Sequence, residues 1–148
     1  MSLQDYKKAG KIAAESLLFG KKLVKEGVLL KDVTKKTEDF VLKQGAKLAF
    51  PVQLSLNNKA AHCYAGNESE EVFKRGDLVK LDVGVHIDGF IGDNALSINL
   101  GGDDDLELIR ASKDALREAI SMMRPGVKLR EIGMAVEEVI VGYGFNPI

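Results

Sequence analysis

The sequence is poor in the residues that mark several classes of protein. It has one cysteine, three prolines and no tryptophan among 148 residues. The single cysteine, Cys63, excludes an internal disulfide framework and is typical of a protein kept in a reducing cytoplasm. No apolar run approaches the ~20 residues that a membrane-spanning helix needs, and the N-terminus lacks a signal-peptide pattern. These absences predict a cytoplasmic protein with no membrane partner.

An excess of charge of one sign is also missing. The chain has 21 Lys and Arg residues against 22 Asp and Glu residues, a net charge of −1. Such a mixture argues against a nucleic-acid-binding surface spread over the whole chain, so we expect no specific nucleic-acid partner. The length, together with a hydrophobic content of 45%, suffices for one ordinary globular domain.

The clearest local signal is a β-hairpin beginning at Gly76. Apolar residues alternate with polar ones there, which is the period of a half-buried strand, at Val79, Leu81, Val83, Val85 and Ile87. The dipeptide Asp88-Gly89 is a strong signal for a two-residue type I′ turn, because both central positions of that turn need positive φ. The chain then returns from Phe90 as the second strand.

The turn fixes the register of the hairpin and places two carboxylates on one face. Asp82 faces Ala95 and Gly84 faces Asp93, so Asp82 and Asp93 become diagonal neighbours, roughly 7–8 Å apart at the backbone. Gly84 leaves room above the sheet. Carboxylates at this spacing can share metal ions that lie about 3.5–4 Å apart, so one interpretation of the pair is half of a two-metal site. The alternative is that this polar face is only the solvated side of an antiparallel sheet.

The remaining segments predict a mixed α/β chain. Helical periodicity covers residues 3–26, 31–44, 105–123 and 129–141. Short strands are expected at 47–50 and 52–56, on either side of Pro51. The acidic run 103–105 is suited to capping the helix that follows it, since Asp near a helix N-terminus favours the helix dipole.

The two helical regions also echo each other. Gly27 corresponds to Gly126, an offset of 99 residues, and Gly45 corresponds to Gly144 at the same offset. Repeated supersecondary units leave echoes of this kind. We therefore expect one domain over residues 1–148, with a first pseudo-repeat at about 3–100 and the start of a second at about 102–148. In that interpretation the chain is a truncated form of a two-copy fold.

Two blocks of the sequence resemble the methionine aminopeptidases, in particular the type 2 branch of archaea and eukaryotes. They are residues 51–62 (PVQLSLNNKAAH) and residues 81–93 (LDVGVHIDGFIGD). That family belongs to the pita-bread metallopeptidases, whose relatives include prolidase and creatinase. The resemblance implies an α/β pita-bread fold, an antiparallel sheet with covering helices that is duplicated about a pseudo-two-fold axis.

The resemblance also implies roles for three residues. Asp82 would bind one metal ion, and Asp93 would bridge two divalent ions, which could be Co, Mn, Fe or Zn. His62 would be the pocket histidine that hydrogen-bonds the substrate and the developing tetrahedral intermediate. The family's further ligands, one histidine and two glutamates, have no counterpart in this sequence, and His86 lies at the wrong place to supply one.

The implied function is removal of the initiator methionine from nascent proteins by a metal-activated water. Because part of the site is missing, we expect the isolated 148-residue chain to be inactive or nearly so. Two alternatives stay open, a non-catalytic pita-bread binding module and an Xaa-Pro dipeptidase of the same fold. A half-fold exposes apolar surface, so self-association is a further expectation.

Overall fold

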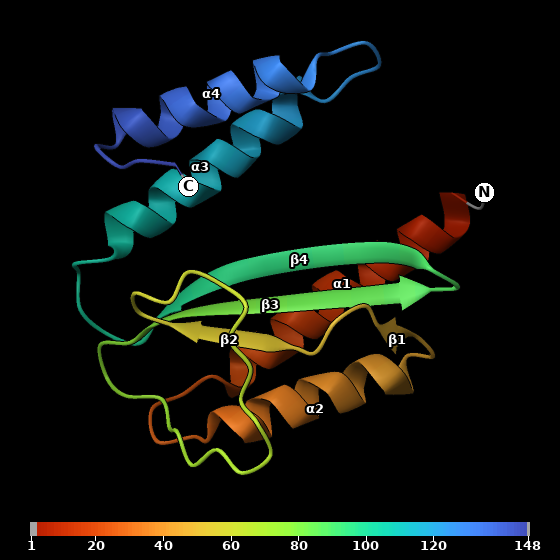
Figure 1. The fold of residues 1–148 in the computed structure, drawn as a ribbon, viewed down its shortest axis with the longest axis vertical. Helices are drawn as coiled ribbons and strands as arrows, with labels where there is room; N and C mark the ends of the chain where they lie inside the picture. Colours follow the sequence, from red (N-terminus) through yellow and green to blue (C-terminus); the bar gives the residue numbers. More distant parts are fainter. Residues whose placement is uncertain (1–2, 148) are drawn as a thin grey trace. The chain divides into compact units, whose positions relative to one another are not determined.

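In the computed structural model, which describes residues 3–147, the chain divides into two compact units between Gly101 and Gly102. The predicted domain limits at residues 1 and 148 lie outside the described part. The first unit contains α1 (Leu3–Leu23), α2 (Leu30–Lys43), β1 (Lys47–Leu48), β2 (Gln53–Leu56), β3 (Leu78–Ile87) and β4 (Phe90–Asn99). The second contains α3 (Leu106–Met122) and α4 (Leu129–Gly142) (Figure 1).

Strand β3 is the centre of a four-stranded antiparallel sheet. It pairs with β4 along its full length, while β1 and β2 both pair with β3, at different positions along it. The two short strands are shorter than predicted and are separated by residues 49–52, which include Pro51. The mixed α/β class and the antiparallel sheet are thus confirmed.

The hairpin has the predicted turn and register. Asp88 and Gly89 have φ values of 49° and 88°, so both central turn residues are left-handed, as a type I′ turn requires. Gly84 pairs with Asp93 and Asp82 pairs with Ala95. His86 serves the same turn, because its Nδ1 accepts a hydrogen bond from the Gly89 N–H at 3.2 Å.

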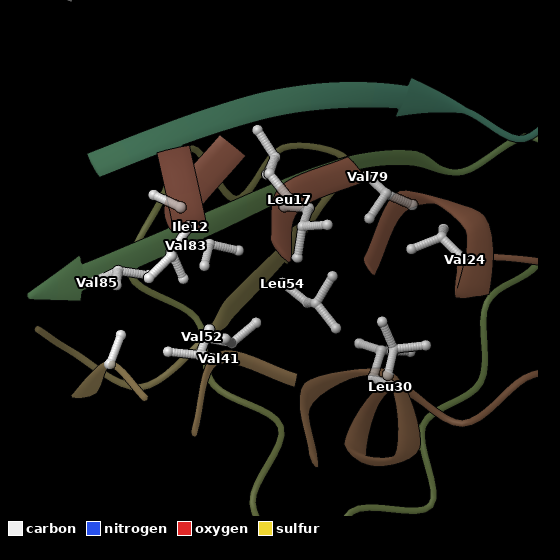
Figure 2. Packing of buried hydrophobic residues seen from close by; sticks show 14 of the residues in the cluster. Ile12, Leu17, Val24, Leu30, Val41, Val52, Leu54, Val79, Val83 and Val85 are labelled. Carbon is white, nitrogen blue, oxygen red and sulfur yellow. The ribbon is translucent and has the colours of Figure 1, made fainter. Parts of the chain in front are cut away.

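The core lies between the sheet and the first two helices. Side chains from α1, α2 and the strands pack together there, including Ile12, Leu17, Val41, Leu54, Val83 and Val85 (Figure 2). Helix α1 comes so close to β4 that a Cβ added at Gly92 would lie 2.5 Å from the Gly10 nitrogen. Glycine at position 92 therefore allows the helix to pack directly on the strand.

The second unit is a pair of helices with little buried surface. Among residues 102–147, the buried apolar side chains are Ala111 and Ala115, both on α3. The Tyr143 hydroxyl, just after α4, donates a hydrogen bond of 2.6 Å to Asp114 on α3. None of the helices among residues 3–147 is long and apolar enough to cross a membrane.

The predicted side-chain cap of α3 does not form. Asp105 occupies the N-cap position, but its side chain makes no capping hydrogen bond. Its backbone, with φ −97° and ψ 0°, lacks the extended conformation from which an N-cap side chain usually reaches the free N–H groups. Asp105 therefore contributes its charge near the positive end of the helix dipole and its carbonyl, which accepts from the Ile109 N–H at 3.0 Å, but no side-chain cap.

Candidate functional site

The open face of the hairpin brings together the two predicted carboxylates. Asp82 lies on the central strand β3 and Asp93 on β4, and the register places them diagonally on one face. Burial raises the pKa of the Asp82 carboxyl above its ordinary value of 3.8, and the charge of Asp93 and a hydrogen bond with it raise this pKa further. The two carboxylates therefore lie on the shared face that the sequence predicts, and the charge of one affects the other.

One oxygen of this pair has no partner. Oδ1 of Asp82 is buried and makes no hydrogen bond within residues 3–147. A buried acceptor of this kind is costly unless something donates to it or coordinates it. The raised pKa and the unpartnered oxygen together describe a place where a cation would relieve both repulsion and desolvation.

His62 joins the pair from a loop. It follows β2 and the turn at Asn57, and its backbone adopts a left-handed conformation with φ 60°. Its charge lowers the pKa of Asp82, opposing the larger effects of burial and Asp93, so the imidazole lies within electrostatic reach of that carboxyl. The side chain is exposed. The structure therefore brings all three predicted residues, His62, Asp82 and Asp93, to one region.

The space predicted above Gly84 is filled. A Cβ added at Gly84 would lie 2.2 Å from Cε1 of Phe50, so the phenyl ring rests directly on the glycine. The expectation of open room at this position was wrong, because Phe50 comes from the connection between β1 and β2 and cannot be placed from the hairpin alone. The glycine makes room for an aromatic wall beside Asp93.

The polar face of the sheet is exposed to solvent at Asp93 on β4 but buried on β2. Asp93 on β4 is exposed. On β2, however, Gln53 and Ser55 are only 5% and 2% exposed. They belong to the same face as Asp82, because Gln53 pairs with Asp82 in the register of β2 and β3. A merely solvated sheet face would not bury polar side chains in this way.

A polar clamp sets the register of β2 against β3. Asn57 donates to Oδ1 of the buried Asp77 at 3.0 Å and accepts from the Leu78 N–H at 3.0 Å. The other Asp77 oxygen accepts from the Lys74 N–H at 2.7 Å. Since Asn57 directly follows β2 and Leu78 begins β3, these bonds determine which β2 residue faces Asp82.

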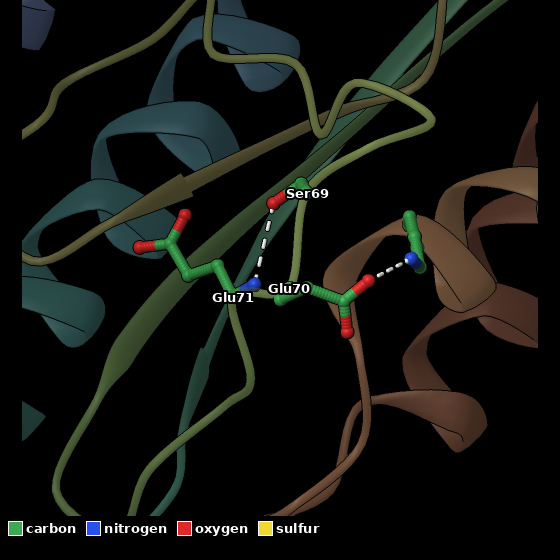
Figure 3. Close-up of polar contacts among 4 residues, drawn as sticks. Ser69, Glu70 and Glu71 are labelled. Atoms are coloured by element: carbon green, nitrogen blue, oxygen red, sulfur yellow. Dashed lines mark hydrogen bonds and ion pairs between the residues drawn. The ribbon is translucent and has the colours of Figure 1, made fainter.

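The polar loop over residues 66–71 is tied to the first unit by side-chain contacts. The Lys31 ammonium on α2 and the Glu70 carboxylate form an ion pair of 2.5 Å, and Ser69 Oγ accepts a 3.3 Å hydrogen bond from the Glu71 N–H (Figure 3). The loop backbone contributes as well, because the Leu30 N–H donates to the Glu71 carbonyl at 3.0 Å. The segment between His62 and β3 is therefore anchored near its middle.

The sequence did not single out three residues that shape the site, namely Phe50, Gln53 and Asp77. Gln53 carried a signal that could have been read, since it is a polar residue between the apolar Val52 and Leu54. Among residues 3–147, no three His, Cys, Asp or Glu side chains gather in an arrangement able to hold a metal ion.

Comparison with known families gives a match over nearly the whole chain. Residues 4–147 match the model described as metallopeptidase family M24. The match includes both sequence blocks and both structural units. It therefore extends beyond the hairpin that carries the two carboxylates.

Individual relatives agree with this match. The chain is 44% identical to the methionine aminopeptidase of Pyrococcus abyssi over 148 residues, all of this chain and 50% of that protein. It is 44% identical to the methionine aminopeptidase of Archaeoglobus fulgidus over 140 residues, 95% of this chain and 47% of that protein. The chain thus spans about half the length of these curated relatives.

A solved structure shows the same fold. The crystal structure of a methionine aminopeptidase from Thermotoga maritima superposes with a TM-score of 0.90 at 30% identity, covering 99% of this chain and 63% of that one. The predicted pita-bread fold is confirmed by this likeness.

Proposed function

Because this chain belongs to metallopeptidase family M24, we propose that it carries part of the active site of a metal-dependent aminopeptidase that removes the N-terminal methionine from nascent proteins. The observation that carries the proposal is the arrangement of His62, Asp82 and Asp93. Two carboxylates interact on one sheet face, and an imidazole lies within electrostatic reach of one of them. The substrate would be the N-terminus of a newly made polypeptide.

Asp82 and Asp93 are suited to hold divalent ions. Carboxylate oxygens are hard ligands that suit Mn, Fe, Co or Zn in sites of mixed oxygen and nitrogen donors. The unpartnered Oδ1 of Asp82 offers a free acceptor. Burial first and the charge of Asp93 second raise the pKa of the Asp82 carboxyl, and a bound dication would offset both. We propose that Asp82 binds one ion and that Asp93 bridges two. Since two ligands are fewer than a tight site needs, this chain alone should bind the ions weakly.

Four residues of this chain would each have a separate role in the hydrolysis. When bound, a divalent ion supplies a water acidic enough to attack near neutral pH and polarises the scissile carbonyl. Asp82 and Asp93 would fix its place on the rigid hairpin. His62 would donate a hydrogen bond from a ring N–H to the substrate carbonyl oxygen as negative charge develops there. Phe50 would exclude water from one side of the pair.

Two other functions fit this chain less well. A non-catalytic binding module of this fold has no need for two interacting carboxylates with an unpartnered buried oxygen. An Xaa-Pro dipeptidase is disfavoured by the relatives named above, both of which are methionine aminopeptidases at 44% identity. We further propose that the protein acts in the cytoplasm, where nascent chains emerge, and that the isolated 148-residue chain hydrolyses methionyl peptides weakly or not at all.

A metal titration tests the proposal. Binding of Mn²⁺ is measured by electron paramagnetic resonance for the wild type and for Asp93→Ala. Loss of one of two carboxylate ligands should weaken binding by more than about tenfold, since even outer partners of metal ligands are worth that much. Asp39→Ala is the matched control, because Asp39 is an exposed acidic residue of α2 with no part in the hairpin, and its loss should leave binding unchanged.

Two results would contradict the proposal. Equal Mn²⁺ uptake by the wild type and Asp93→Ala would place the ions elsewhere and favour the binding module. Robust hydrolysis of methionyl peptides by the isolated chain, unaffected by Asp93→Ala, would show that catalysis does not use this pair.

A further inference from the structure

Gln53 is a buried polar residue whose side chain holds the backbone of a nearby loop residue. It is 5% exposed on β2 and faces Asp82 on β3. Its Oε1 accepts a hydrogen bond of 3.1 Å from the backbone N–H of His62. A glutamine buried in a strand is unusual, and this bond accounts for its acceptor oxygen.

The backbone of His62 needs such support. Its φ of 60° is left-handed, a conformation that a residue with a Cβ rarely adopts unless its surroundings hold it there. The next residue is held as well, because the Leu54 N–H donates to the Cys63 carbonyl at 3.0 Å. Two consecutive residues of β2 therefore hold two consecutive residues of the loop.

We propose that Gln53 is a positioning residue that fixes His62 beside Asp82 and Asp93. Gln53 pairs with Asp82 on the neighbouring strand, and the tip of its side chain holds the backbone of His62. Without this bond the loop residue would relax to a right-handed or extended backbone, and the imidazole would point in a different direction. The functional meaning of this inference rests on the proposed function, but the contact itself does not.

Amide exchange tests the contact. In ¹⁵N-labelled protein, the exchange of the His62 amide proton with water is measured by NMR for the wild type and for Gln53→Met, which keeps the side-chain length but loses the acceptor oxygen. We expect exchange to accelerate by roughly tenfold or more, as for the loss of one hydrogen bond. The backbone chemical shifts of His62 should also lose their left-handed signature.

A conservative variant separates positioning from simple packing. Gln53→Glu keeps an acceptor oxygen at the same place, so it should restore slow exchange at His62. Gln44→Met is the matched control, since Gln44 is an exposed glutamine at the end of α2 and its loss should change nothing at His62. If Gln53→Met fails to fold, Gln53→Thr replaces it, because threonine suits a strand and cannot reach the His62 amide.

A second readout connects the contact with the metal pair. Mn²⁺ bound at Asp82 and Asp93 should broaden the ring protons of His62 in the wild type and in Gln53→Glu, and broaden them less in Gln53→Met. Unchanged exchange and shifts at His62 in Gln53→Met would overturn the inference. Changed exchange at His62 with no Mn²⁺ broadening near Asp82 would instead support the contact and count against the proposed function.

Discussion

Helices α2 and α4 have the same local backbone but very different surroundings. They span Leu30–Lys43 and Leu129–Gly142, so both the start and the end of α4 lie 99 residues after those of α2. The preceding residues have nearly equal angles, with φ −70° and ψ 134° at Leu29 and φ −84° and ψ 134° at Lys128. Their capping bonds repeat at the same offset, as in the bonds from Gly45 N–H to Leu42 and from Gly144 N–H to Val141.

Burial separates the two helices. Helix α2 buries five residues against the sheet and α1, namely Leu30, Val33, Thr34, Thr37 and Val41. None of residues 129–142 in α4 is buried. Similar local sequences therefore make similar helices, whereas the presence of a sheet within the unit decides which of them forms a core. The agreement of backbone and hydrogen bonds supports the predicted internal repeat, which remains a proposal.

The largest expected effect concerns the contact between helix and sheet. Gly92→Ala would place a Cβ 2.5–2.6 Å from backbone atoms of Ala9 and Gly10, and backbone cannot move aside cheaply. We expect the free energy of unfolding of the first unit to fall by about 3 kcal/mol. Urea denaturation followed by circular dichroism, with amide exchange resolved for each unit, measures it.

Gly133→Ala provides the contrast for that experiment. Gly133 lies within α4, and a Cβ there would meet nothing within 4 Å. Because alanine is the better helix former, this substitution should stabilise α4 by up to about 1 kcal/mol. A loss of stability at Gly133 as large as that at Gly92 would show that the comparison between the two units is wrong.

An intermediate effect is expected at equivalent core positions. Val33 and Ile132 correspond at the offset of 99, but Val33 is 1% exposed while Ile132 is only half-buried. Val33→Ala should destabilise the first unit by about 2 kcal/mol, because it leaves a cavity in a packed core. Ile132→Ala removes more atoms yet should cost less than about 1 kcal/mol. Equal losses in denaturation experiments would contradict the burial seen here.

The smallest effect concerns the bond that joins α3 to the end of α4. The Tyr143 hydroxyl lowers the pKa of Asp114 below 3.8, and the same bond raises the pKa of Tyr143 above 10.0. Its stabilisation is therefore present between these ordinary values. It is lost as the pH falls through the lowered pKa of Asp114 or rises through the raised pKa of Tyr143.

Tyr143→Phe removes this bond and should flatten both pH dependences in the second unit alone. The measurement is amide exchange in α3 and α4 as a function of pH, compared with the wild type. Tyr6→Phe is the control, because Tyr6 contacts Phe90 in the first unit and has no part in the bond. A pH dependence that persists unchanged in Tyr143→Phe would assign it to other groups.

Local signals in the sequence determined the helices, the hairpin and the shared face of Asp82 and Asp93. These features depend on residues close together in the chain. The Asp88-Gly89 turn, for example, has positive φ values that by themselves set the register of the hairpin. The family resemblance added His62 and predicted the fold that the comparisons confirm. The metal-binding and catalytic roles of these residues remain predictions.

Only the tertiary structure decided what surrounds that face. Phe50 on Gly84, Gln53 beneath the His62 loop and Asp77 in the Asn57 clamp all join residues separated by 9 to 34 positions through side chains. The sequence predicts the period of a strand. It does not predict which side chain from another strand covers the strand's face, because this depends on how β1, β2 and β3 pack together. The hairpin was therefore predictable, whereas the walls of the site were not.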